Sequence, residues 1–139
     1  MTIIETSETI LKRLKEIDGP KTIDDWGGEI DDLIKQAAKL PGLFVVYSGA
    51  RFGPKENIGD NNAAHADTWT IVVIDKNLRG MDAAAVGCYE LIQAVRDKLI
   101  GFDVGDAWLW PNSEDLFYNA KGKMAYACTY MIETETEDS

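Results

Sequence analysis

The sequence has few of the side chains from which reaction centres are usually built. Its 139 residues include two cysteines and one histidine, too few for a zinc site made of Cys and His ligands. Cys88 and Cys128 each have apolar neighbours, so we expect two buried free thiols rather than a disulfide. His65 lies in a polar segment, where we expect it to be exposed to solvent.

Long hydrophobic runs are also missing. No apolar stretch approaches the ~20 residues that a helix needs to cross a bilayer. Residues 1–17 lack the basic-then-apolar order of a secretion signal and have the spacing of an amphipathic helix. We therefore expect a protein that is made and kept in the cytoplasm, without membrane contact.

Positive charge is scarce, because 14 Lys and Arg residues stand against 24 Asp and Glu residues, a net charge of −10. Such a surface repels the phosphates of nucleic acids and of anionic lipids. A role in gripping DNA is therefore disfavoured. The same acidity is compatible with a protein past which DNA must move without sticking.

Glycine-rich phosphate-binding motifs are absent as well. Residues 70–80, "TIVVIDKNLRG", lead from an apolar run into a helical pattern but contain neither GxGxxG nor GxxxxGK[ST]. No spacing provides Asp75 with a partner acid or base, and Ser48 is not in a GxSxG turn. We interpret residues 75–80 as a turn, and we expect no catalysis, no cofactor and no metal.

What the sequence does contain is a series of amphipathic and apolar elements. Thr2 and Glu5 have capping-box spacing, so a helix is predicted from the N-terminus to the stop at residues 18–20. Further helices are predicted over residues 29–40 and 83–100, the latter between Asp82 as N-cap and Gly101 as left-handed cap. Strands are predicted at residues 43–47 (continuing towards Phe52), 69–74, 116–118 and from 124 onward.

This order predicts a single domain over residues 1–139. The strands come in adjacent pairs, which favours hairpins. We therefore predict an α+β fold, with a mainly antiparallel four-stranded sheet and helices packed on one face. Residues 24–28 are expected to be a linker, residues 53–66 a long loop and residues 133–139 a frayed acidic tail.

Two tryptophans are the most informative aromatic residues. Trp108 and Trp110 lie two positions apart, so on a strand they would share a face. The simplest interpretation is that they pack under a helix. The alternative is that they anchor a subunit contact, where tryptophan is enriched.

Taken in order, the segments resemble a known family. A first helix is followed by "LPGLFVVYSGARF", then by "WTIVVIDKNLRG" leading into "GCYELIQAVRDKLIG", and finally by a hairpin ending in "MAYACTYMIETE". This succession resembles the Mu-like prophage minor tail proteins, which are related to the tail terminator (tail completion) proteins of long-tailed bacteriophages. The resemblance extends from the first helix to about residue 135.

The resemblance implies a tail-terminator-like domain that assembles into a ring, expected to be a hexamer. Such a ring caps the tail tube, ends its polymerisation and helps to join the tail to a head-tail joining protein. DNA would pass through the lumen without specific binding. The resemblance implies no cofactor and no catalysis, and it places the protein in the host cytoplasm during assembly and then in the virion tail.

Loop placement, rather than any family residue, suggests which side chains take part. Arg51 and Lys55 lie around the start of the loop at residues 53–66, which we expect to face a partner and to order on assembly. Together with Trp108 and Trp110 they are the predicted assembly contacts. The acids predicted to line the lumen are Asp60, Asp67 and Asp75.

Two other classes of function remain open from the sequence. A small cytoplasmic ligand-binding or regulatory α+β module would show a discrete apolar pocket. A small enzyme would show clustered titratable groups whose pKa values are strongly shifted.

Overall fold

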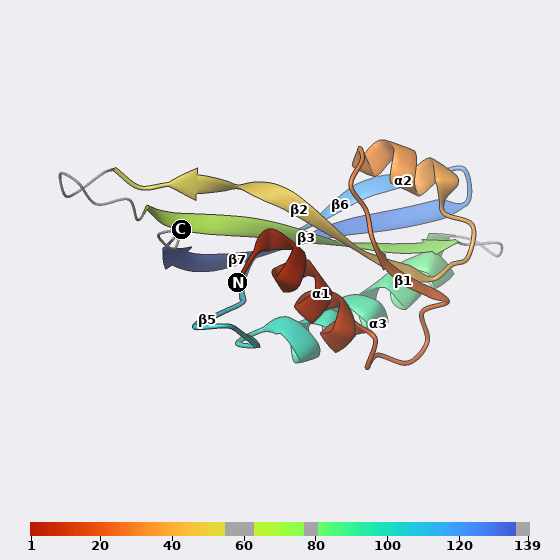
Figure 1. The fold of residues 1–139 in the computed structure, drawn as a ribbon. Helices are drawn as coiled ribbons and strands as arrows, with labels where there is room; N and C mark the ends of the chain where they lie inside the picture. The colour runs from red at the N-terminus through yellow and green to blue at the C-terminus, as the bar shows by residue number, and fades with distance from the viewer. Residues whose placement is uncertain (55–62, 77–80, 136–139) are drawn as a thin grey trace.

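The computed structural model describes residues 1–54, 63–76 and 81–135, and for residues 81–86 and 134–135 it describes the backbone alone. In chain order the elements are α1 (Ile3–Leu14), β1 (Thr22–Asp25), α2 (Ile30–Gln36), β2 (Gly42–Phe52), β3 (Ala64–Lys76), α3 (Met81–Leu99), β4 (Asp103–Val104), β5 (Ala107–Trp108), β6 (Trp110–Ala120) and β7 (Lys123–Glu135). Figure 1 shows a twisted sheet with α2 on one face and with α1 and α3 on the other.

The main sheet contains five strands in the order β1-β2-β3-β7-β6, and β4 and β5 form a separate hairpin. The last four strands pair antiparallel, as the sequence predicted, whereas β1 pairs parallel to β2. The prediction of four strands is therefore wrong, because β1 ends inside the segment expected to be a linker. Of its four residues only Ile23 is apolar, so no hydrophobic period marks it in the sequence.

The helices cover both faces of the sheet, so the expectation of helices on one face is also wrong. Leu43 and Val45 of β2 pack in the core below α1 and α3, while Phe44 and Val46 pack in a second cluster below α2. Successive residues of a strand point to opposite faces, so a strand that is apolar at every position is buried on both. The unbroken apolar runs of β2 and β3 therefore indicated, in the sequence, that both faces of the sheet are covered.

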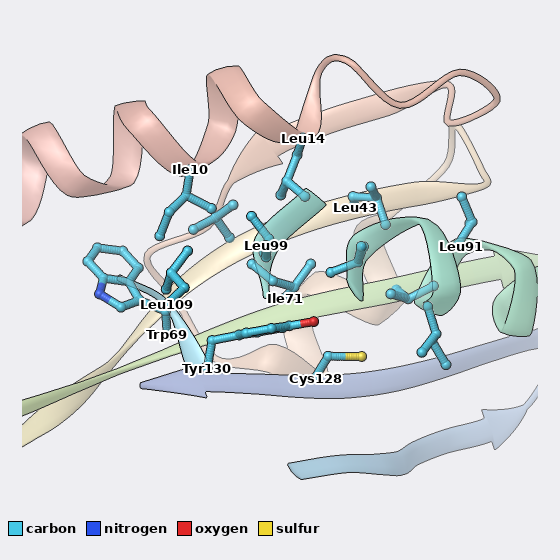
Figure 2. Packing of buried hydrophobic residues seen from close by; sticks show 14 of the residues in the cluster. Ile10, Leu14, Leu43, Trp69, Ile71, Leu91, Leu99, Leu109, Cys128 and Tyr130 are labelled. Atoms are coloured by element: carbon cyan, nitrogen blue, oxygen red, sulfur yellow. The ribbon is translucent and has the colours of Figure 1, made fainter. Parts of the chain in front are cut away.

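The larger core lies between the sheet and helices α1 and α3 (Figure 2). Ile10, Leu14 and Leu99 descend from the helices onto Leu43 and Ile71 of the sheet, and all five are fully buried. Burying side chains of this size stabilises a domain by about 1.5–3 kcal/mol each.

The two cysteines are buried and free, which confirms the prediction. Burial raises the pKa of the Cys88 thiol and of the Cys128 thiol to about 12. Both thiols are therefore protonated at neutral pH, and a protonated thiol is a poor nucleophile. In this fold they serve as small apolar side chains.

The start of α1 confirms the local signal, because Thr2 and Glu5 form the capping box. The helix ends after Leu14, earlier than the stop predicted at residues 18–20. Arg13 then joins α1 to the end of α3, because its Nε donates to the carbonyl of Lys98 at 3.0 Å and its guanidinium lies 4.8 Å from the ring centroid of Phe102.

α2 is shorter than predicted, and a residue far away in the sequence contacts its C-terminal end. It runs over Ile30–Gln36, and Ala37 leaves the helical conformation at ψ 118°. The Nζ of Lys123, at the start of β7, donates to the carbonyls of Ile34 and Ala37, both at 2.8 Å. A lysine here neutralises the negative end of the helix.

α3 is the long helix that the sequence predicted, and it ends at Gly101 with a left-handed φ of 74°. Gly87 lies directly on β3, because a Cβ at this position would run into the carboxylate of Asp75. Helix and sheet therefore approach each other closely at this position. The helix begins at Met81, so Asp82 lies inside it and the prediction of Asp82 as N-cap is wrong.

The hairpin of β6 and β7 is confirmed and is longer than expected. Lys121 and Gly122 form its two-residue turn with φ values of 52° and 75°, the conformation of a type I′ turn. Residues 64–66, expected in a loop, belong to β3, and residues 133–135, expected in the acidic tail, belong to β7. No helix in the described residues is long and apolar enough to cross a membrane.

Candidate assembly surface

Three strands extend beyond the helices and form a projection that we call the arm. It consists of residues 48–52 of β2, 64–68 of β3 and 131–135 of β7 (Figure 1). All of the arm residues in β2 are partly or largely exposed, in contrast to the buried first half of that strand. The domain's own helices therefore leave this half of β2 uncovered.

A β-bulge at the base of the arm sets its register. The pairing between β2 and β3 shifts between Tyr47 and Gly49, and Gly49 adopts a φ of 116° that favours glycine. Beyond the shift, Arg51 pairs with Ala66, which in turn pairs with Glu133 of β7. These three residues consequently form one row across the arm.

Both outer edges of the arm are unpaired in the described part of the chain. β1 pairs with β2 only as far as Val45, and β6 pairs with β7 only as far as Met131. Beyond these points β2 and β7 each pair with β3 on one side and with no described strand on the other. Unpaired strand edges carry free N–H and C=O groups that bind another strand readily.

The two tryptophans lie beside the β7 edge. Trp108 and Trp110 are each 58% exposed, while Leu109 between them is fully buried. They line a groove of about 450 Å³ together with Asp106, Ala107, Pro111, Met131 and Glu133. The interpretation that the tryptophans pack under a helix is therefore wrong, because Leu109 is the residue that enters the core.

The single histidine is not the exposed loop residue that the sequence suggested. His65 is the second residue of β3, its side chain is 10% exposed, and its ring lies 5.2 Å from the ring of Phe52. Its Nε2 is 3.4 Å from Oδ2 of Asp67, and the hydroxyl of Tyr47 donates to Oδ1 of Asp67 at 3.3 Å. This polar cluster links β2 to β3 in the arm.

Burial, and then the negative charge of Asp67, raise the pKa of Tyr47. The tyrosine therefore remains a neutral hydrogen-bond donor to the carboxylate throughout the physiological range. Among the described residues no group of three or more His, Cys, Asp or Glu side chains is placed to hold a metal ion.

Comparison with known protein families places this geometry in context. The family model described as "Bacteriophage Mu, Gp37" matches residues 2–137, which is nearly the whole chain. The chain belongs to this family. Among curated proteins no sequence matches the chain.

The fold of this Bacteriophage Mu, Gp37 family member also occurs in a solved particle. A chain in the structure described as the virion of a native gene transfer agent particle superimposes with a TM-score of 0.59 at 15% identity. The match covers 91% of this chain and 92% of the other. The family is therefore that of a bacteriophage protein, and its fold is shared with a chain of a virion particle.

In this family member the predicted contact residues fall in different places. Arg51 lies in the arm and is exposed, and Trp108 and Trp110 flank the groove. Asp67 lies in the arm, whereas Asp75 lies at the other end of β3 against Gly87 of α3. Burial raises the pKa of Asp75. Lys55 and Asp60 lie outside the described residues.

The groove also contains residues that sequence reasoning did not single out. Glu133 was expected to belong to a frayed tail, and Met131 was assigned only to a strand face. No apolar residue follows Ile132, so no hydrophobic period marks the extension of β7 to Glu135. Nothing local to Asp106 marks it as a groove residue, since the turn between β4 and β5 brings it there.

Proposed function

We propose that this protein is a tail terminator, a ring-forming protein that caps the tail tube and stops its polymerisation. Membership of the Bacteriophage Mu, Gp37 family and the fold shared with a virion chain support this proposal. The observation that carries it is the arm, which has two open strand edges, one of them, on β7, beside two exposed tryptophans.

Exposing Trp108 and Trp110 lowers the solubility of a monomer, and the acidic surface of the rest of the protein offsets this loss. Tryptophan is enriched at the energetic centres of protein interfaces because it buries a large area with little loss of conformational freedom. Two such residues in one groove, with Met131 beside them, are typical of a surface that another protein covers. Assembly with another protein would remove these side chains from water.

In this proposal the partners are other copies of the chain, the tail tube protein and a head-tail joining protein. One face of a six-membered ring resembles a tube subunit closely enough to bind the last tube ring, and the opposite face does not accept another. Arg51 faces a partner, and Asp67 and Asp75 lie along the lumen and repel passing DNA. Assembly takes place in the host cytoplasm, and the product remains in the virion tail.

The test is a tube-assembly reaction followed by electron microscopy. Tube protein polymerised alone should give long tubes of variable length, and adding this protein should shorten them and leave density at one end. Replacing both Trp108 and Trp110 by Ala should abolish the effect. Phe117→Ala is the matched control, because Phe117 is also an exposed aromatic residue but lies far along β6 from the groove. Tubes of unchanged length with bare ends would refute the proposal.

A ligand-binding role is the second candidate, because the groove volume of about 450 Å³ is within the range of small-molecule sites. It predicts that a compound which raises the melting temperature of the wild-type protein fails to do so for Trp110→Ala. A screen of diverse metabolites in which no compound shifts the melting temperature would count against it.

A further inference from the structure

The arm presents two different edges that could meet only between separate copies of the chain. On one side β2 is unpaired after Val45, and on the other β7 is unpaired after Met131, in both cases with respect to the described residues. β2 and β7 are both antiparallel to β3, so they run in the same direction. The two edges therefore lie on opposite sides of one three-stranded ribbon.

We propose that neighbouring copies join by parallel pairing of the β2 edge of one arm, residues 50–52, with the β7 edge of the next arm, residues 132–134. This inference rests on the proposed ring, for which it names the contact between subunits. Each copy would use a different edge on each side. Such a head-to-tail contact closes into a ring when a whole number of these rotations completes one turn without a rise along the axis, and it otherwise gives an open filament.

The backbone of β2 offers donors on the required side. Gly53 donates its N–H to the carbonyl of Ala64, so the N–H of Gly53 points towards β3. Because these groups alternate along a strand, the N–H groups of Ala50 and Phe52 point outward. The amide of Trp26 donates to Val45 before the bulge, so β1 occupies this edge only at the base of the strand.

The charges of the two edges are complementary. Glu133 and Asp106 line the groove at the β7 edge, and Arg51 is an exposed cation near the end of β2. Arg51 and Glu133 belong to one row of the arm, and residues in one row share a face of the sheet. In a pairing without stagger, the Arg51 of one copy therefore lies beside the Glu133 of the next, on the same face.

The groove also suits the shape of the incoming strand. β6 begins at Trp110, opposite Met131, so a strand added beyond Met131 would continue in line with β6. In the same pairing the residue of the incoming β2 nearest to Trp110 is Gly49, where a Cβ would have nothing within 4 Å. Because Gly49 has no side chain, the indole of Trp110 has room to cover the contact between the two copies.

The first test is an exchange of charges, read out by sedimentation velocity and native mass spectrometry of the purified full chain. Arg51→Glu and Glu133→Arg should each weaken self-association by about tenfold or more, and the double variant should restore it to near the wild-type level. Lys12→Glu, on the exposed side of α1, is the matched control for the change in net charge. Single variants without effect, or a double variant weaker than both, would overturn the proposed pairing.

The second test addresses the backbone. Ala50→Pro removes an outward N–H without removing a bond to β3, and it should abolish ring formation while the monomer keeps its melting temperature within a few degrees. Ala50→Val retains the N–H and should assemble normally. Rings formed equally well by both variants would exclude β2 as the joining strand.

These outcomes separate the inference from the proposed function. A wild-type protein that remains monomeric at every accessible concentration, yet still caps tubes, would overturn the pairing of copies and leave the tail terminator role standing. A protein that forms rings dependent on Arg51 and Glu133 but never binds tubes would support the pairing and refute the terminator role.

Discussion

Lys123 shows how much of an element's position can depend on one residue. Its ammonium group lies at the end of α2, where it reaches the carbonyls of Ile34 and Ala37 and also, at 3.4 Å, that of Lys35. Only a tertiary contact provides this arrangement, because Lys123 is far from α2 in the chain. The seven-residue helix has no side-chain cap at its other end.

Lys123→Met should therefore destabilise the protein by about 1–2 kcal/mol, since it removes several charge-assisted hydrogen bonds while keeping the apolar stem. The measurement is denaturant unfolding, with hydrogen exchange showing the largest loss of protection in α2. Lys121→Met, two residues away in the exposed turn, is the control and should be close to neutral. Equal stability of the two variants would show that the lysine does not hold the helix.

Asp75 is a residue whose ionisation opposes folding. Desolvation beside α3 outweighs the amide of Lys76 and the charges of Lys21 and Lys76, and so raises the pKa of the carboxyl above 3.8. An acid with a raised folded-state pKa favours the fold when it is protonated. Its contribution to stability is present below the unfolded-state pKa and is lost as the pH rises through the folded-state pKa.

Asp75→Asn should accordingly increase the free energy of unfolding at pH 7, by less than about 1 kcal/mol because the carboxyl is only half buried. At about pH 3, where the wild-type carboxyl is protonated in both states, the two proteins should be equally stable. Thermal unfolding at both pH values measures the difference. A variant that is less stable than the wild type at pH 7 would contradict the assigned cause.

At the scale of elements, the contact between α3 and β3 depends on the absence of a side chain at Gly87. Alanine normally stabilises a helix interior by up to about 1 kcal/mol relative to glycine. Here the carboxylate of Asp75 occupies the space of the added methyl group. Helix propensity and packing therefore act in opposite directions at this position.

A double-mutant cycle separates these two effects. Gly87→Ala in the wild type should give no gain in stability or a loss, whereas in an Asp75→Ala background the same change should stabilise by about 0.5–1 kcal/mol. Urea unfolding of the four proteins measures the coupling. An identical effect of Gly87→Ala in both backgrounds would show that the carboxylate moves aside at no cost.

At the scale of the whole molecule, the net charge of −10 acts against assembly. Copies brought together in a ring repel one another at long range, while the proposed contact between Arg51 and Glu133 attracts at short range. Salt screens the distant repulsion more strongly than a close pair. The balance of these effects determines how assembly responds to ionic strength.

Self-association should therefore become stronger as NaCl is raised from about 20 to 200 mM, over which the screening length falls from roughly 20 Å to below 10 Å. Sedimentation velocity at a fixed protein concentration measures the change. Arg51→Gln should retain the upward trend but associate more weakly at every salt concentration. Assembly that weakens steadily with salt would show that attractive ion pairs, and not net repulsion, dominate the interface.

Much of the fold could be predicted from local signals. The capping box of Thr2 and Glu5, the apolar stripe of α3 and the alternation of the last strand each depend on residues that are near one another in the chain. β1 and the exposure of Trp108 could not be predicted in this way. β1 exists because β2 offers it an edge, and Trp108 is exposed because Leu109 occupies the core instead.

The sequence by itself determined the helices, the antiparallel strands, the two buried thiols and the family. Periodicity, capping and the order of apolar segments depend only on residues that are close together in the chain. Only the tertiary structure decided that α2 covers the second face of the sheet and that the arm has two open edges. It also decided that Arg51 and Glu133 share a row. The physical reason is that each of these features depends on which distant segments pair, and on where that pairing stops.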